Sequence, residues 1–209
     1  MFINIIKNKF KIDEPILTDD IIMLFPNYNR TYIFRLINDA IKKGELVKFS
    51  RGVYYLPRQT ELGLSSITAD DVIERKFICE NNKVFGIYDG ISLLNSFFIT
   101  TQVPNVIEIV TNNETMRKRT IIIDGRTFIL RKSRFTITKN NVNVYIILQL
   151  FNNISLTENI NSFSKEKIIS FINENRISQE MLLKNSLRFP SIVLKNIVRS
   201  GILNEVAWQ

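Results

Sequence analysis

The residues NRTYIFRLINDAIKKGELVKFSRGVYYLP, at positions 29–57, contain the clearest structural pattern of the chain. The first half of this stretch carries apolar residues at helical spacing on one face, namely Ile33, Leu36, Ile37, Ala40 and Ile41. Asn29 stands where an N-cap belongs, and Gly44 follows two lysines as a C′ glycine. We therefore expect a single amphipathic helix between Asn29 and Gly44.

A short β-ribbon is expected directly after this helix. Residues 46–49 and 53–56 have strand composition, and the turn Ser50-Arg51-Gly52 separates them. A helix followed at once by a hairpin with a basic tip is the sequence outline of a winged helix-turn-helix. Two further helices are expected upstream, over residues 2–10 and 19–25, with Thr18 as the cap of the second.

The expected fold class is α+β, with two domains. Residues 1–60 are predicted to form a winged helix-turn-helix DNA-binding domain, and residues 61–209 a second, α+β domain. Within the second domain, strand signals lie in 61–139 and helical patterns in 140–209. The short run 142–151 fits either a helix or a buried strand. Ser164, Ser178 and Gly201 are the expected caps and stop of the later helices.

The polar face of the helix after Asn29 has the residue types that read DNA. Arginine and asparagine can each make two hydrogen bonds to a guanine or adenine edge, and recognition helices use their N-terminal residues for this purpose. The predicted base-reading residues are Asn29, Arg30, Thr31, Arg35 and Asn38. The predicted phosphate contacts are Lys42, Lys43, Lys48 and Arg51. Two other interpretations stay open: a merely solvated helix face, and a winged helix that docks another protein.

The net charge supports a polyanionic partner. The chain has 28 Lys and Arg against 20 Asp and Glu, a formal charge of +8. Residues 1–60 hold 10 cations and 6 acids, which is +4 and half of the excess. Nucleic acid is the first partner class that this charge suggests, and an anionic membrane surface is the second.

Basic residues also flank a predicted hairpin in the second domain. Asp124-Gly125 between β-branched runs is a strong hairpin signal. The flanking cations are Arg117, Lys118, Arg119, Arg131, Lys132 and Arg134. They could converge into a second phosphate-contacting patch or a docking surface for an acidic partner, or they could protect an edge strand by charge.

An enzyme is not expected. The chain has no histidine, and Cys79 is its only cysteine, which removes the usual metal sites and nucleophilic triads. No glycine-rich phosphate cradle is present, and we expect neither metal nor cofactor. The nearest catalytic pattern is Asp70, Asp71, Glu74 and Lys76, which has the spaced acids and lysine of a metal-dependent nuclease but lies in a stretch with helix-start chemistry. With no membrane span and no disulfide, a cytoplasmic location is expected.

An ordered set of motifs resembles the AbiEi family of antitoxins. They are SRGVYYLP at 50–57, FGIYDG at 85–90, TTQVPN at 100–105 and EIVTN at 108–112. The resemblance covers about residues 16–135. Asp89 and the stretch 95–98 depart from the small and glycine-containing residues of that family.

The resemblance implies a type IV toxin–antitoxin, or phage-defence, system. The N-terminal domain would repress its own operon by binding repeats in double-stranded promoter DNA. The second domain would supply the antitoxic activity against a nucleotidyltransferase-like toxin. In this class the antitoxin is taken to oppose the action of the toxin rather than to block it in a tight complex.

Overall fold

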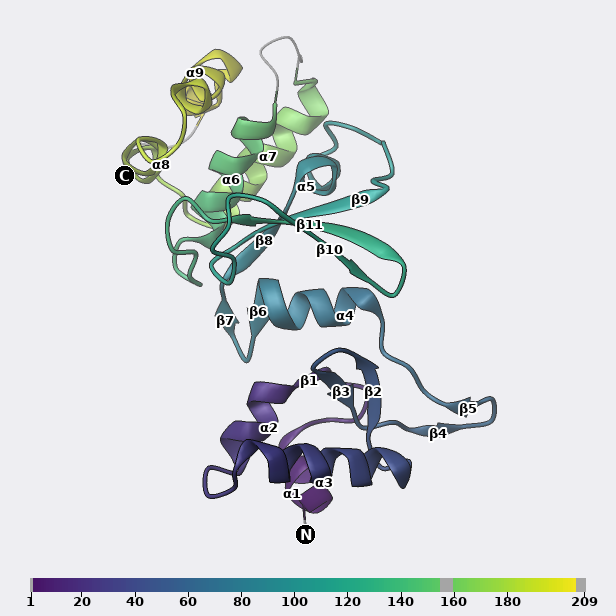
Figure 1. The fold of residues 1–209 in the computed structure, drawn as a ribbon. Coiled ribbons are helices and arrows are strands. Elements are labelled where there is room, and N and C mark those ends of the chain that lie inside the picture. Colours follow the sequence, from purple (N-terminus) through teal and green to yellow (C-terminus); the bar gives the residue numbers. More distant parts are fainter. Residues whose placement is uncertain (1, 155–159, 206–209) are drawn as a thin grey trace. The chain divides into compact units, whose positions relative to one another are not determined.

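A computed structural model describes residues 2–154 and 160–205 of the chain. The fold is mixed α+β with small sheets, and the chain divides into two compact units, Met1–Arg75 and Lys76–Gln209 (Figure 1). The domain division predicted after residue 60 stays a prediction. Within the described ranges, no helix is long and apolar enough to cross a membrane.

The first unit consists of short helices around a small sheet. In chain order it contains α1 (Phe2–Lys9), β1 (Ile16–Leu17), α2 (Thr18–Leu24), α3 (Arg30–Lys42), β2 (Val47–Ser50), β3 (Val53–Tyr55), β4 (Gln59–Thr60), β5 (Gly63–Leu64) and α4 (Ala69–Ile73). The sheet has the order β1-β3-β2, and both pairings are antiparallel. A single π-helical turn, Glu74–Ile78, follows α4.

The helix and ribbon expected from residues 29–57 are confirmed as α3, β2 and β3. Asn29 caps α3 by accepting a hydrogen bond from the Tyr32 backbone N–H at 2.8 Å. Gly44 has φ +70°, the left-handed conformation that a helix-stopping glycine adopts. The apolar face of α3 is buried through Ile33, Ile37 and Ala40. These residues pack into a core with Ile6, Ile16, Ile21, Phe25, Leu46, Tyr54 and Leu56.

Three short strands of the first unit, β1, β4 and β5, were not expected. Ile16 and Leu17 form β1 by pairing with Tyr54 and Val53 of β3. The polar connector after Pro57 folds into the hairpin β4–β5, and the Tyr55 hydroxyl donates to the Ser65 carbonyl oxygen at 2.8 Å. Two-residue strands carry too short a pattern to be recognised from sequence.

The prediction that Thr18 caps α2 is wrong. The N-cap position belongs to Leu17, and Thr18 is the first residue of the helix. The Asp20 carboxylate accepts from the Leu17 backbone N–H at 2.9 Å, so it satisfies a backbone donor at this helix start. The Thr18 side chain instead reaches the Gly52 carbonyl oxygen.

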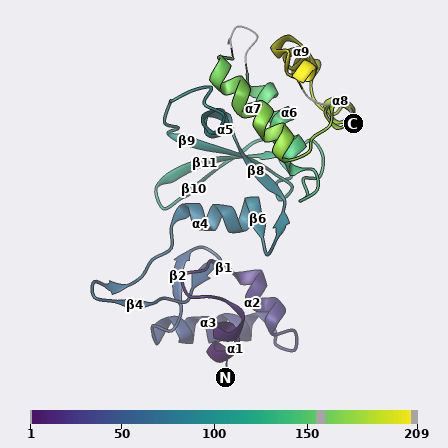
Figure 2. The same ribbon diagram turned by 180° about the vertical axis from the view of Figure 1, so that it is seen from behind.

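The second unit is built on a four-stranded mixed sheet. Its elements are β6 (Cys79–Glu80), β7 (Lys83–Val84), β8 (Gly86–Asp89), α5 (Gly90–Ser96), β9 (Val106–Thr111), β10 (Arg119–Ile123), β11 (Arg126–Lys132), α6 (Val142–Asn153), α7 (Ser162–Glu174), α8 (Gln179–Ser186), α9 (Ser191–Ser200) and a 3-10 turn (Ile202–Glu205). The sheet order is β10-β11-β9-β8, and β9 and β11 are parallel. The helices α5 to α9 gather over one face of the sheet (Figures 1 and 2).

The predicted Asp-Gly hairpin is confirmed. Ile123 pairs with Arg126 across a two-residue turn. Asp124 has φ 48° and Gly125 has φ 73°, which are the left-handed conformations of a type I′ turn. Upstream, the strands β7 and β8 are separated at Phe85.

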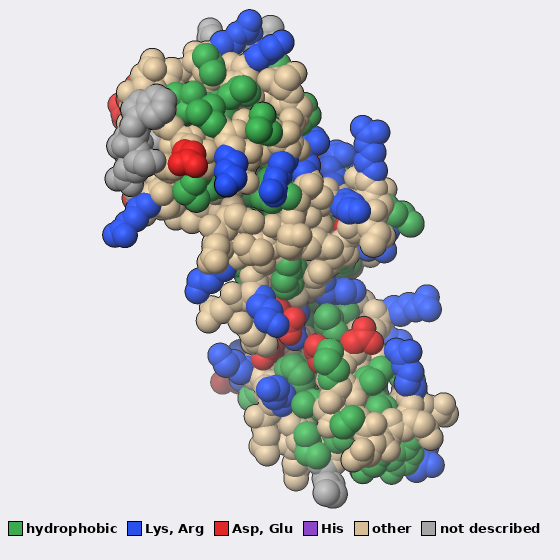
Figure 3. All heavy atoms as spheres, turned by 90° about the vertical axis from the view of Figure 1, so that its left-hand side faces the viewer, with side chains coloured by type: hydrophobic (Ala, Val, Ile, Leu, Met, Phe, Trp, Pro, Cys, Tyr) green, Lys and Arg blue, Asp and Glu red, His purple; other side chains and the backbone are tan. Residues whose placement is uncertain are grey.

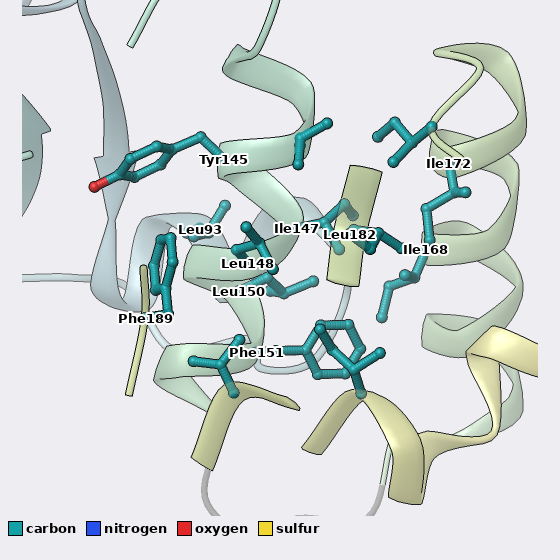
Figure 4. Close-up of a cluster of buried hydrophobic side chains, with 14 of the residues drawn as sticks. Leu93, Tyr145, Ile147, Leu148, Leu150, Phe151, Ile168, Ile172, Leu182 and Phe189 are labelled. Carbon is teal, nitrogen blue, oxygen red and sulfur yellow. The ribbon is translucent and has the colours of Figure 1, made fainter. Parts of the chain in front are cut away.

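The run 142–151, which the sequence left open, is the helix α6. Its residues form the centre of the core of the second unit, together with Leu93, Ile168, Ile172, Leu182 and Phe189 (Figure 4). Ser178 and Gly201 cap α8 and stop α9 as expected. Ser164 is not the cap of α7, because Asn161 takes that position and the Ser164 hydroxyl donates to the Phe98 carbonyl oxygen at 2.8 Å.

Candidate nucleic-acid interface

One face of α3 is exposed along its whole length. Thr31, Arg35, Asn38 and Lys42 are all exposed, and their spacing of three or four residues puts them on one side of the helix. Phe34 lies among them and is 41% exposed. The side chains that the sequence assigns to base reading and to phosphate contact therefore form a continuous stripe.

Arg35, one of the predicted base-reading residues, contacts an aromatic ring on the same helix. Its guanidinium carbon lies 5.0 Å from the centroid of the Tyr32 ring, a cation–π contact that limits the freedom of a long side chain. Among the described residues, no carboxylate forms an ion pair with Arg35. Its planar fork of donors is thus held in position and is available for a planar acceptor pair.

Two of the proposed base-reading residues are already partly engaged. The Asn29 side-chain oxygen is occupied by the cap, which leaves only its amide NH₂ for a base. The Arg30 guanidinium lies 3.6 Å from the Asp19 carboxylate, and both side chains are more than 70% exposed. Such an exposed pair contributes little and can exchange for a DNA contact.

The tip of the β2–β3 hairpin carries Arg51, which is exposed. Gly52 beside it has φ +75°, and its carbonyl oxygen accepts two hydrogen bonds from Thr18, from the backbone N–H at 3.0 Å and from the hydroxyl at 3.3 Å. The start of α2 therefore fixes the tip. Lys48 is exposed on β2, and Lys42 and Lys43 are exposed at the end of α3.

An aromatic groove lies beside α3 and was not expected from the sequence. Phe2, Phe25, Tyr28 and Tyr32 form a chain of ring contacts with centroid distances of 4.9, 5.8 and 5.1 Å. They line a hollow of about 420 Å³ between α1 and α3. Figure 3 shows hydrophobic side chains gathered on the surface of the first unit. The spacing of residues 25, 28 and 32 was the available signal, but spacing alone does not distinguish an exposed ring from a buried one.

The second basic patch, in the other unit, is brought together in part. Arg117, Arg131, Lys132 and Arg134 line one cavity of about 500 Å³. Lys118 is exposed and does not line this cavity. Arg119 lies on β10, the edge strand of the sheet, and its guanidinium is 2.6 Å from the Glu114 carboxylate. For Arg119, this position agrees with the interpretation that a charged side chain protects the edge strand from pairing with another chain.

Glu114 shows how firmly Arg119 is held. Burial opposes ionisation of this carboxyl, but backbone N–H groups of Met116 and Thr115 donate to it at 3.0 and 2.8 Å, and Arg119 adds a cation. Together these donors outweigh burial and hold the pKa of Glu114 below its usual value. Arg119 is therefore engaged in an ion pair with Glu114 inside the chain.

The floor of the same cavity carries polar groups that the sequence did not single out. Asp89 is 3% exposed and accepts hydrogen bonds from the side-chain amides of Gln149 and Asn153, at 3.0 and 2.6 Å. Burial raises the pKa of Tyr145 to about 12, so its hydroxyl keeps its proton at neutral pH. Helix α6 supplies these amides and the tyrosine, and β8 supplies the carboxylate. No local sequence pattern links residues 60 positions apart.

The acidic stretch considered for a nuclease is helical. Asp70 and Asp71 lie in α4, and Glu74 and Lys76 lie in the π-helical turn, so the Glu and Lys do not lie on a strand as that chemistry requires. Asp71 serves the helix start, because its carboxylate accepts from the Thr68 backbone N–H and hydroxyl, both at 2.7 Å. Across residues 2–154 and 160–205, no group of three or more His, Cys, Asp or Glu side chains could hold a metal ion.

Comparison with known proteins gives one family. The family described as "Family of unknown function (DUF6088)" matches residues 15–180, which covers most of both units. No curated protein matches the chain.

Proposed function

The chain belongs to this family of unknown function, DUF6088, and from its own residues we propose that it is a DNA-binding transcriptional regulator with an N-terminal winged helix-turn-helix. The observation that carries the proposal is the exposed stripe of α3, which is followed in the chain by a hairpin with Arg51 at its tip. Arg35 would read a base edge, assisted by Thr31 and Asn38. Lys42, Lys43, Lys48 and Arg51 would contact phosphates and set the register on the duplex.

The order of elements in the first unit supports this proposal. A helix, a short strand, two helices and a hairpin follow one another, and β1 joins the hairpin on the β3 side. In a winged helix-turn-helix the second helix of the pair enters the major groove and the hairpin lies along the backbone. At 13 residues, α3 is about 20 Å long, enough to lie in a major groove.

We further propose that the protein is the antitoxin of a type IV toxin–antitoxin system. This part rests on the motifs in residues 16–135 that resemble AbiEi antitoxins. The first unit would repress the operon by binding promoter repeats in the cytoplasm, without catalysis. The second unit would oppose a nucleotidyltransferase-like toxin.

A titration with promoter DNA tests the regulator. We expect the protein to bind a labelled duplex from upstream of its own gene more tightly than a scrambled duplex, with an affinity that falls as salt rises. The variant Arg199→Ala, which removes an exposed cation from α9 in the other unit, is the control and should bind like the wild type. Equal affinity for both duplexes would refute sequence-specific regulation.

A growth assay tests the antitoxin separately. Expression of an adjacent nucleotidyltransferase-like gene should arrest growth, and co-expression of this chain should restore it. The double variant Arg35→Ala, Lys42→Ala should still restore growth, because that activity is assigned to the second unit. Failure of the wild type to restore growth would refute the antitoxin proposal and leave the DNA proposal standing.

The aromatic groove favours a second candidate, a winged helix that docks another protein. Tyr28 is 45% exposed and Tyr32 is 36% exposed, and tyrosines of this kind are common anchors of interfaces. This candidate predicts salt-insensitive binding to the product of a neighbouring gene, weakened by Tyr28→Ala, with no binding to promoter DNA. Salt-sensitive promoter binding that survives Tyr28→Ala would exclude it.

A further inference from the structure

The polar cavity in the second unit that is lined by Arg117, Arg134 and Asp89 combines a cationic rim with a hydrogen-bonding floor. Four cationic side chains and the carboxylates of Asp89 and Glu108 line it, which leaves a formal charge of +2. The cations come from both sides of the β10–β11 hairpin, and the floor comes from β8, β9 and α6. Its volume of about 500 Å³ lies within the range of small-molecule sites.

Internal pairing neutralises one of the four cations. The Arg131 guanidinium donates to Glu108 Oε2 from Nε at 2.9 Å and from Nη2 at 2.7 Å. Because of this pair, Arg131 can orient a ligand but adds little net positive potential.

The other cations are not compensated. In the described part of the chain, Arg117, Lys132 and Arg134 make no ion pair with a carboxylate. The Arg134 guanidinium lies 5.2 Å from the centroid of the Phe189 ring, which restricts where its donors can point. Like-charged groups converging at one mouth repel one another unless an anion lies between them. Arginine forks match the oxygens of a phosphate especially well.

The floor suits a different part of a ligand. Asp89 is an acceptor held in place by two amides, and Asn152 adds a further amide to the lining. The Tyr145 oxygen accepts from the Arg134 backbone N–H at 2.9 Å, so its own proton can be donated. Carboxylates, amides and a phenol are the groups that bind sugar hydroxyls.

We propose that this cavity binds a small phosphate ester that carries hydroxyl groups, the class of sugar phosphates and nucleotides. Arg117 and Arg134 hold the phosphate at the mouth, and Asp89 with its amide partners accepts the hydroxyl groups at the floor. A bare nucleic-acid backbone fits less well, because the Asp89 carboxylate on the floor repels a chain of phosphates. The site is independent of the DNA-binding face assigned to the first unit.

Calorimetry on the full chain tests the proposal. The probes are inorganic phosphate, ribose 5-phosphate, glucose 6-phosphate, the four nucleoside monophosphates, and adenosine as the ligand without phosphate. We expect at least one phosphate ester to bind, and adenosine and inorganic phosphate each to bind at least tenfold more weakly. Arg117→Gln and Arg134→Gln should each weaken the bound ester by about tenfold or more.

The control is Arg199→Gln, which removes the same charge from an exposed position on α9 and should leave affinity within twofold. Arg117 is exposed and makes no hydrogen bond, ion pair or ring contact within the described ranges, so its variant should fold normally even if Arg134→Gln does not. The proposal is overturned if no ester binds at millimolar concentration. It is also overturned if the affinity for the ester is unchanged in both Arg117→Gln and Arg134→Gln. It is also overturned if those variants weaken only binding to duplex DNA, which would make the patch a nucleic-acid surface.

Discussion

Thr18 holds Gly52 with two hydrogen bonds, one from its backbone N–H at 3.0 Å and one from its hydroxyl at 3.3 Å. The two residues are 34 positions apart, yet they join the first turn of α2 to the tip of the β2–β3 hairpin. This link fixes the position of Arg51 relative to the helices. It also makes the backbone at Gly52 a sensitive point, because a Cβ there would lie 3.3 Å from the Thr18 hydroxyl oxygen.

We expect Gly52→Ala to destabilise the protein by about 1–2 kcal/mol, because alanine is strained at φ +75° and its methyl group crowds Thr18. Urea unfolding measures this loss. Gly44→Ala is the matched control, since Gly44 has φ +70° but nothing within 4 Å of the added carbon. Gly44→Ala should lose only the stability that the strained φ angle costs. A larger loss of stability than for Gly52→Ala would contradict the steric explanation.

Tyr145 should make stability fall at high pH. Its pKa in the folded chain is about 12, against an ordinary value of 10.0, because burial disfavours the phenolate. The folded state therefore holds this proton more tightly than the unfolded chain does. The resulting stabilisation is complete below about pH 10 and is lost as the pH rises towards 12, by up to about 3 kcal/mol.

Urea unfolding of wild type and Tyr145→Phe between pH 9 and 12 isolates this effect from other titrations. At pH 9 the variant should be less stable by about 1–3 kcal/mol, because the Arg134 backbone N–H loses its acceptor. The difference between the two proteins should shrink as the pH rises. A difference that is constant with pH would show that Tyr145 has no raised pKa.

Asn196 on α9 should be important for the helical layer. It is 6% exposed, and its side-chain amide donates to the carbonyl oxygens of Phe151 and Ile154 at 2.9 and 3.0 Å. Asn196→Ala leaves buried carbonyls without donors at the end of α6, and we expect a loss of about 2–4 kcal/mol in thermal unfolding. Asn173→Ala, at an exposed position of α7, should cost less than about 0.5 kcal/mol. Similar losses for both variants would refute this role.

Elements with strong local signals could be predicted from sequence. The helix after Asn29 has an apolar face, a cap and a stopping glycine, and each local preference agrees with the others. The Asp124-Gly125 turn is similar, because only a few residue types accept two consecutive left-handed conformations. The exposure of Arg35 and its neighbours on the polar face of α3 could be predicted from the same helical periodicity.

Features that depend on distant partners could not be predicted. Strand β1 forms only because Ile16 and Leu17 pair with β3. The Thr18 side chain binds the Gly52 carbonyl oxygen instead of capping α2. The floor of the polar cavity joins Asp89 to Gln149 across 60 residues. Sequence patterns report spacing within one element, whereas these arrangements depend on how elements pack.

Affinities for operator and random duplexes test most directly whether α3 reads DNA bases through Arg35. Arg35→Ala should reduce the discrimination between them by about 1–3 kcal/mol, whereas Lys42→Ala should weaken both equally and lower the salt slope by about 1. If Arg35→Ala leaves the discrimination intact, α3 does not read bases through this residue.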